Sequence, residues 1–281
     1  MFLLVGGDST IGAATAGVLR ARKMPFLATS RRRDARDALP LDLRAIDEFA
    51  VPPGVTAACI FAAVARLGDC AADPEGTRAI NVLGTLALAE KLAAAGVFTL
   101  YLSTDKVFDG TRPLVPADAP LSPASEYGRQ KAEAETALRA LGVPLGILRL
   151  AKVVPPRMAL FAGWDTALRA GQPVGAFTAM MVAPTPIDLV ATRIADMLAT
   201  RDAAVRQLSG PRDVSYFEIA RFIARRAVAD EALVEPTDGA AVMPPGGLAA
   251  HTTLATEIAV PDAFAVVDWS LGENSPARPT R

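Results

Sequence analysis

The 281-residue sequence contains few of the residues that form disulfides or bind metals. Its two cysteines, Cys59 and Cys70, are too few for a disulfide framework. Its single histidine, His251, excludes a metal site built from histidines. We therefore expect neither a secreted disulfide scaffold nor a metal centre.

The chain also lacks an excess of charge and a long hydrophobic run. Its formal net charge is -1, which offers no strong field to nucleic acid or to an anionic membrane, so we expect neither as a partner. Glu90 and Lys91 interrupt the most hydrophobic stretch, which is thus unsuited to span a bilayer. Asp8 comes too early for the apolar region of a signal peptide. These absences predict a soluble, cytoplasmic protein.

Hydrophobic residues make up 51% of the chain, which is enough for a sizeable core. Short apolar runs alternate with amphipathic segments over the first 150 residues, and they predict buried strands separated by helices. This pattern indicates the α/β class, with a Rossmann-like, doubly wound parallel sheet in residues 1–150. The expected strands are Phe2–Val5, Pro25–Thr29, Leu39–Leu43, Ala57–Val64, Phe98–Ser103 and Leu145–Leu150. The expected helices are Ile11–Arg22, Pro74–Ala95 and Ser125–Leu141.

The pattern changes after residue 150. Residues 151–281 contain proline clusters, helix candidates at 186–200 and 214–228, and little expected strand. We predict a smaller, irregular substrate-side domain there, which agrees with the roughly two domains that the length suggests. The tail from about residue 274 is expected to be disordered.

A small-residue turn follows the first expected strand and precedes the first expected helix. It reads Gly6-Gly7-Asp8-Ser9-Thr10-Ile11-Gly12, with a serine where a middle glycine is usual. Small residues allow the backbone to approach a pyrophosphate, and the helix N-terminus supplies free N–H groups. The motif predicts a dinucleotide site, with a plain tight turn as the alternative.

The second expected strand ends in Ser30-Arg31-Arg32-Arg33, and no acidic residue appears before Asp34. A site for NAD requires a carboxylate near this point to hold the ribose hydroxyls, whereas the 2′-phosphate of NADP requires arginine. The cluster favours NADP(H). For any one arginine, a solvated basic turn is the alternative.

Tyr127 and Lys131 form a Y-x-x-x-K pair in an expected helix. Residues at i and i+4 lie on one helix face, so the lysine would favour phenolate and lower the pKa of the tyrosine. Such a tyrosine can donate a proton to a carbonyl oxygen. With three tyrosines and five lysines in the chain, a chance pair arises in about one case in twenty.

Ser103-Thr104-Asp105-Lys106-Val107-Phe108-Asp109-Gly110 lies at the carboxyl end of an expected strand. Side chains at this end of a parallel sheet point into the ligand crevice. Thr104 would donate a hydrogen bond to the carbonyl oxygen that Tyr127 protonates. A threonine that merely ends the strand is the alternative reading of this motif taken alone.

Together, these motifs resemble the extended short-chain dehydrogenase/reductase superfamily. Ser-Thr-Asp-x-Val-Phe-Asp-Gly resembles the dTDP-4-dehydrorhamnose reductase group, which reduces nucleotide-linked 4-keto sugars. The resemblance implies NADP(H) as cofactor, a nucleotide sugar as substrate and a homodimer. It implies Thr104, Tyr127 and Lys131 as catalytic residues. The implied cofactor-binding residues are Gly6, Gly7, Ser9, Thr10, Ile11, Gly12, Ser30, Arg31, Arg32, Asp42, Leu43, Ala62, Ala63, Val64, Asn81, Ser103, Tyr127 and Lys131.

The sequence departs from the group at several positions. Ser9 replaces a glycine, Phe61 replaces an asparagine, and Lys106 stands where rhamnose-type reductases usually carry tyrosine. Three functions therefore remain open. The first is an NADPH-dependent reductase of a nucleotide-linked keto sugar. The others are a dehydratase or epimerase that recycles its cofactor, and a non-catalytic NADP-binding regulatory subunit.

Overall fold

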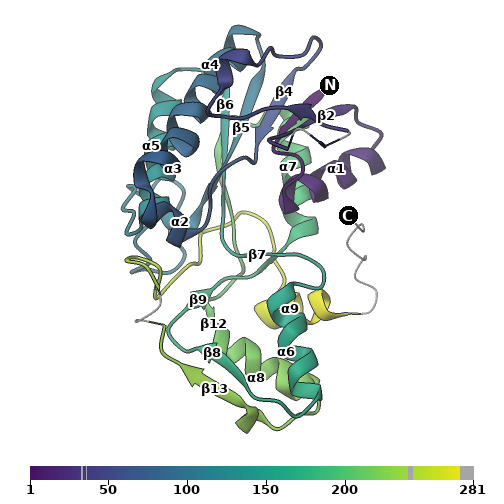
Figure 1. The fold of residues 1–281 in the computed structure, drawn as a ribbon, viewed down its shortest axis with the longest axis vertical. Helices are drawn as coiled ribbons and strands as arrows, with labels where there is room; N and C mark the ends of the chain where they lie inside the picture. The colour runs from purple at the N-terminus through teal and green to yellow at the C-terminus, as the bar shows by residue number, and fades with distance from the viewer. Residues whose placement is uncertain (33, 36, 240–242, 273–281) are drawn as a thin grey trace. The chain divides into compact units, whose positions relative to one another are not determined.

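The computed structural model describes residues 1–32, 34–35, 37–239 and 243–272 (Figure 1). The expectation for the tail from residue 274 lies outside these residues. The chain divides into two compact units. Unit 1 comprises Met1–Phe108, Pro120–Leu150 and Asp188–Gln207, and unit 2 comprises Asp109–Ala119, Ala151–Ile187 and Leu208–Arg281. We expected a single boundary at residue 150, but the chain returns to unit 1 for residues 188–207.

The central sheet has seven strands in the order β11-β6-β5-β4-β1-β2-β3. The register pairs β1 in parallel with both β2 and β4, and β5 in parallel with both β4 and β6. This arrangement confirms the predicted Rossmann-like α/β fold. Its strands are β1 (Phe2–Val5), β2 (Phe26–Ser30), β3 (Leu39–Pro40), β4 (Ala57–Ile60), β5 (Phe98–Thr104), β6 (Leu145–Leu150) and β11 (Val205–Leu208).

Two strands end earlier than their apolar runs suggested. Ile60 in β4 pairs with Val5, the last residue of β1, so the residues after Ile60 have no further residue of β1 to pair with. The backbone N–H groups of Phe61 and Ala62 both turn to the Val5 carbonyl oxygen. The stretch that was expected to continue as strand to Val64 is instead a loop at the carboxyl edge of the sheet. Strand β3 likewise stops at Pro40 rather than at residue 43.

Helices cover both faces of the sheet (Figure 1). One face carries α1 (Thr10–Ala21) and α7 (Ile187–Thr200), and Arg22 forms an ion pair with Asp196 beside them. The other face carries α2 (Leu67–Ala72), α3 (Pro74–Arg78), α4 (Thr85–Ala94) and α5 (Glu126–Ala140). The long helix expected over Pro74–Ala95 contains a π-helical segment, Ala79–Gly84, between α3 and α4. Within the described residues, no helix is both long and apolar enough to cross a membrane.

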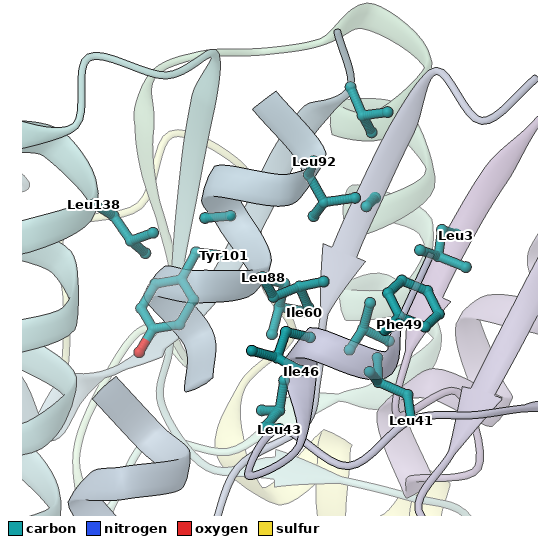
Figure 2. Close-up of a cluster of buried hydrophobic side chains, with 14 of the residues drawn as sticks. Leu3, Leu41, Leu43, Ile46, Phe49, Ile60, Leu88, Leu92, Tyr101 and Leu138 are labelled. Carbon is teal, nitrogen blue, oxygen red and sulfur yellow. The ribbon is translucent and has the colours of Figure 1, made fainter. Parts of the chain in front are cut away.

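The core of unit 1 lies between the sheet and the helices α4 and α5. Figure 2 shows Leu88 and Leu92 of α4 above Ile60, with Tyr101 and Leu138 beside them. All five side chains are almost completely buried. Each buried side chain of this size contributes about 1.5–3 kcal/mol, so this layer holds α4 and α5 on the sheet.

Helix α5 is also attached to β6 by a buried ion pair. The Arg149 guanidinium donates to both carboxylate oxygens of Glu135, and Nη2 lies 2.7 Å from Oε2. The two side chains are 1% and 0% exposed. Arg149 also donates to the side-chain oxygen of Gln207 in β11 and stacks on the ring of Phe108. Because a buried charge requires a partner, these contacts hold α5 in one position along the sheet.

Unit 2 contains short strand pairs where little strand was expected. These are β7 (Val153–Val154) with β10 (Thr185–Pro186), β9 (Met181–Val182) with β12 (Val214–Ser215), and β8 (Val174–Phe177) with β13 (Val234–Thr237). Its helices are α6 (Ala159–Arg169), α8 (Tyr216–Arg226) and α9 (Ala263–Leu271). In its core Trp164 meets Tyr216 edge to face, with ring centroids 6.2 Å apart.

Asp213 organises one loop of unit 2. Its carboxylate accepts hydrogen bonds from the backbone and hydroxyl groups of Thr252 and Thr253, and it lies 3.1 Å from His251 Nδ1. Thr253 in turn accepts a hydrogen bond from the Leu114 backbone. The Asp213 carboxylate therefore fixes this segment together with backbone hydrogen bonds from His251 to Gly110 and from Val115 to Thr253.

Replacing Arg149 by alanine would leave the Glu135 carboxylate buried without its cation. We expect Arg149→Ala to lower the free energy of unfolding by about 3–5 kcal/mol. Urea denaturation followed by circular dichroism measures this loss. Arg139→Ala, an exposed arginine on the same helix, serves as the matched control. A loss for Arg149→Ala no larger than that of the control would contradict the anchoring role.

Candidate functional site

A cavity of about 560 Å³ opens at the carboxyl ends of β1 and β4. The strand order of the sheet reverses between these two strands, which is where ligands bind in open α/β sheets. Nine of the predicted cofactor-binding residues line it: Gly6, Ser9, Arg31, Arg32, Asp42, Leu43, Ala62, Ala63 and Val64. The remaining predicted residues, Gly7, Thr10, Ile11, Gly12, Ser30, Asn81, Ser103, Thr104, Tyr127 and Lys131, lie outside its lining.

The three glycines of the glycine-rich turn have too little room for a side chain. Gly6 has a φ of +75°, and a Cβ on Gly12 would lie 2.8 Å from the Gly6 carbonyl oxygen. A Cβ on Gly7 would lie 2.8 Å from the Cβ of Ala28. Ser9 tolerates its side chain because its φ is -68°, and its hydroxyl caps α1 by accepting from the Gly12 N–H. The turn thus has the close backbone packing of a phosphate cradle, with serine in place of one glycine.

The cavity also contains a carboxylate that the arginine cluster did not predict. Asp8 Oδ2 accepts from the Ser30 hydroxyl at 2.8 Å and from Arg32 Nε at 3.2 Å. Asp42, which also lines the cavity, forms a bidentate pair with Arg44, and this hydrogen bonding lowers the pKa of the Asp42 carboxyl. Arg33, the third arginine of the cluster, lies outside the described residues. Two of the cavity's acidic groups are therefore already paired with arginine.

Asn81 does not line the cavity, but it binds the backbone of Val64, which does. Its side-chain oxygen accepts from the Val64 N–H at 2.8 Å, and its amide donates to the Val64 carbonyl at 2.9 Å. The same amide donates to the side-chain oxygen of Gln130 on α5 at 2.8 Å. Asn81 is 1% exposed, so it positions the loop after β4 rather than facing the cavity.

Tyr127 and Lys131 lie one turn apart on α5, as predicted. The Ser125 hydroxyl caps this helix, and Gly128 allows the carbonyl of Lys106 to approach its first turn. Lys131 is 4% exposed, donates to the Leu102 carbonyl of β5 and lies 3.9 Å from the centre of the Tyr101 ring. Helix α5 thus brings the pair against the carboxyl half of β5.

The pKa of Tyr127 is shifted in the direction opposite to our expectation. Burial raises the pKa of this phenol, and the negative charge of Asp105 raises it further. The Lys131 ammonium points to the Leu102 carbonyl and the Tyr101 ring. Burial also lowers the pKa of Lys131 to about 7, despite the opposing effect of Glu135. Desolvation, rather than the lysine charge, dominates at this tyrosine.

Thr104 ends β5 and starts the short helical turn Asp105–Val107. Its hydroxyl donates to Asp105 Oδ1 at 2.9 Å and accepts from the Lys106 N–H at 3.2 Å. Because a hydroxyl has one hydrogen, Thr104 can donate to a ligand only after it releases Asp105. Lys106 Nζ lies 3.1 Å from the other oxygen of Asp105. The neighbouring Ser103 hydroxyl is buried and has no hydrogen-bond partner among the described residues.

The sequence patterns missed two kinds of site residue. Asp8 lies inside the glycine-rich motif, and the motif predicts a function for its small residues but none for this carboxylate. Arg66 and Asp69 also line the cavity, but they belong to α2 and its N-cap, a short helix that the apolar pattern did not indicate. The only signal in the sequence at these positions is that each residue is charged.

Asn81→Ala would leave the Val64 N–H and the side-chain oxygen of Gln130 without their partner, and the Val64 carbonyl would keep only the weak thiol donor of Cys70. Each buried polar group left unpaired costs about 1–3 kcal/mol, so we expect a loss of roughly 3 kcal/mol in unfolding free energy. Asn81→Asp keeps the acceptor for the Val64 N–H but loses both donors, and it should also destabilise. Urea denaturation measures both variants. Wild-type stability in Asn81→Ala would contradict the role of this side chain.

The lowered pKa of Lys131 makes stability depend on pH. Between pH 7 and the usual lysine pKa of about 10.5, the unfolded chain binds more protons, so the contribution of Lys131 to stability rises with pH. The stability difference between wild type and Lys131→Met should shift in favour of wild type by about 1.4 kcal/mol per pH unit. Urea denaturation at pH 7.5, 8.5 and 9.5 measures it, with Lys23→Met as a net-charge control. A pH-independent difference would contradict this assignment.

The chain matches curated proteins over short segments. It is 40% identical over 65 residues to methionine adenosyltransferase 2 subunit beta of Xenopus tropicalis, covering 23% of this chain and 20% of that protein. It is 38% identical over 90 residues to a dTDP-4-dehydrorhamnose reductase of Sinorhizobium fredii, covering 32% and 30%. The matched segments therefore span less than a third of either relative.

Solved structures resemble the chain over most of its length. The dTDP-4-dehydrorhamnose reductase of Bacillus anthracis, in complex with NADP, superposes with a TM-score of 0.79 and 16% identity, covering 95% of this chain and 96% of that one. The UDP-glucose 4-epimerase of Thermus thermophilus, in complex with NAD, superposes with a TM-score of 0.73 and 22% identity, covering 90% and 89%. At these identities the likeness concerns the fold. Residues 1–270 match the RmlD substrate binding domain family, and the chain belongs to that family.

Proposed function

We propose that the protein is an NADPH-dependent reductase of a nucleotide-linked keto sugar. One observation carries the proposal: α5 brings Tyr127 and the buried Lys131 against the end of β5, where Thr104 lies. The same unit contains the cavity at the switch point of the sheet. A proton donor beside a dinucleotide cradle is the arrangement that carbonyl reduction requires.

The residues of unit 1 fit a dinucleotide. Glycine at positions 6, 7 and 12 allows the turn to pack closely at the start of α1. Gly6 and Ser9 line the cavity, and the N-terminus of α1 favours the charge of a pyrophosphate. Ser9, Arg31 and Arg32 line the cavity and could contact the phosphates of NADP(H). Leu43 and Ala62–Val64 also line it. The NADP named with the Bacillus anthracis structure supports the same assignment. When bound, NADPH supplies the hydride that reduces the carbonyl carbon.

The chain's own residues would handle the proton. The raised pKa of Tyr127 keeps a proton on its hydroxyl at neutral pH, ready for the developing alkoxide oxygen. Lys131, whose pKa is lowered to about 7, lies one turn along the same helix and loses its positive charge as the pH rises above 7. Thr104 would stabilise the same oxygen after its hydrogen turns away from Asp105. Family membership and the sugar-nucleotide enzymes among the structural relatives support the substrate class.

Tyr127→Phe removes the proton donor and keeps the ring. We expect it to lower kcat for NADPH oxidation by about 10²–10⁴-fold, because that is the usual contribution of a general acid. The assay follows NADPH absorbance with a panel of nucleotide-linked 4-keto-6-deoxy sugars. Tyr216→Phe makes the same change in the core of unit 2 and serves as the matched control.

The result has three informative outcomes. NADPH oxidation that depends on Tyr127 supports the reductase and identifies the sugar. A tightly retained cofactor that is recycled during substrate turnover without net oxidation indicates a dehydratase or epimerase. Tight NADPH binding with no turnover of any panel member contradicts the reductase proposal for these substrates.

A second candidate function is a non-catalytic regulatory subunit that binds NADP(H). The match to a protein named as the beta subunit of methionine adenosyltransferase 2 favours it. In this case nucleotide binding would persist, and Tyr127→Phe would leave the regulatory effect on a partner enzyme unchanged. The homodimer implied by the family resemblance stays a prediction, which analytical ultracentrifugation tests.

A further inference from the structure

The glycine-rich turn carries a carboxylate to the end of β2. Asp8 follows Gly6 and Gly7 and lies just before the N-cap of α1, yet its Oδ2 accepts from the hydroxyl of Ser30, the last residue of β2. In a dinucleotide fold, an acidic residue near this strand end holds the 2′-hydroxyl of the adenosine ribose. Here β2 ends in Ser30 and is followed by arginines, and Asp8 supplies the carboxylate from the glycine-rich turn, which also lines the cavity.

Asp8 also pairs with Arg32, an arginine of the cavity that could otherwise bind a 2′-phosphate. Arg32 donates through Nε to Asp8 Oδ2 at 3.2 Å, and its Nη2 lies 3.1 Å from the same oxygen. The Asp8 side chain is 32% exposed and that of Arg32 is 64% exposed, so both groups are accessible from the cavity. A 2′-phosphate would have to compete with Asp8 for this guanidinium and would meet a like charge beside it.

We propose that Asp8 determines nucleotide selectivity, limiting the preference for NADPH over NADH. The carboxylate accepts from a free ribose 2′-hydroxyl, whereas it competes with a 2′-phosphate for Arg32. Arg31, which also lines the cavity, would still attract the phosphate. This inference rests on the proposed function, because it concerns the cofactor of the same site.

Direct binding tests the proposal without a substrate. Isothermal titration calorimetry with NADPH and with NADH, at one fixed ionic strength, gives the ratio of the two affinities. Asp8→Asn keeps the shape of the side chain and removes its charge. We expect the ratio to rise about fivefold in favour of NADPH, the effect of releasing one exposed ion pair. Asp69→Asn removes a negative charge from the same cavity, away from β2, and is the matched control.

A double variant isolates the role of Arg32. Because part of the effect comes from the pairing of Asp8 with Arg32, Asp8→Asn should raise the ratio less in an Arg32→Gln background than in the wild type. Thermal melting confirms that each variant is folded, and Asp8→Ser provides a second charge-free side chain. A rise specific to the Asp8 variants supports the proposal. An unchanged or lower ratio, or an equal rise in Asp69→Asn, overturns it and leaves the reductase proposal intact.

Failure of the cofactor assignment itself gives a different result. If the folded wild-type protein binds neither NADPH nor NADH, the proposed function and the selectivity role both fall. If it binds both nucleotides and only the Asp8 prediction fails, the selectivity role alone is wrong.

Discussion

The buried ion pair between Glu135 and Arg149 fixes the position of the helix on which the candidate chemistry depends. Both side chains are removed from water, so neither charge is stable without the other. Arg149 also binds Gln207 of β11, which ties the helix to two strands. Helix α5 therefore has one register along the sheet, and that register places Lys131 at the Leu102 carbonyl and Tyr127 near the end of β5.

Once α5 is fixed, burial controls the electrostatics of the site. Desolvation raises the pKa of Tyr127 and lowers that of Lys131, so each group is biased toward its neutral form. Asp105 strengthens the effect at Tyr127 and also binds the Thr104 hydroxyl. The three residues of the sequence motif therefore lie in one region, but Asp105 controls how two of them can act.

In the cavity too, the role of a charged side chain depends on the charges that the fold places beside it. The sequence at the end of β2 contains arginines and no acidic residue, which favours the 2′-phosphate of NADP over the free ribose of NAD. The fold then brings Asp8 to Ser30 and Arg32 from 22 and 24 positions away in the chain. Asn81 similarly reaches the Val64 backbone from outside the cavity. In both cases the side chain acts at a place that its own sequence neighbours do not reveal.

Local sequence was enough to predict the α/β class, the order of the main strands and helices, the glycine-rich turn and the i, i+4 spacing of Tyr127 and Lys131. These features depend on local periodicity and on side-chain size, which can be determined from the sequence alone. Four features could not be predicted from local sequence: where β4 ends, the place of residues 188–207 in unit 1, the direction in which the pKa of Tyr127 shifts, and the pairing of Asp8 with Arg32. Each of these depends on desolvation or on contacts between distant segments, and neither exists until the chain has folded.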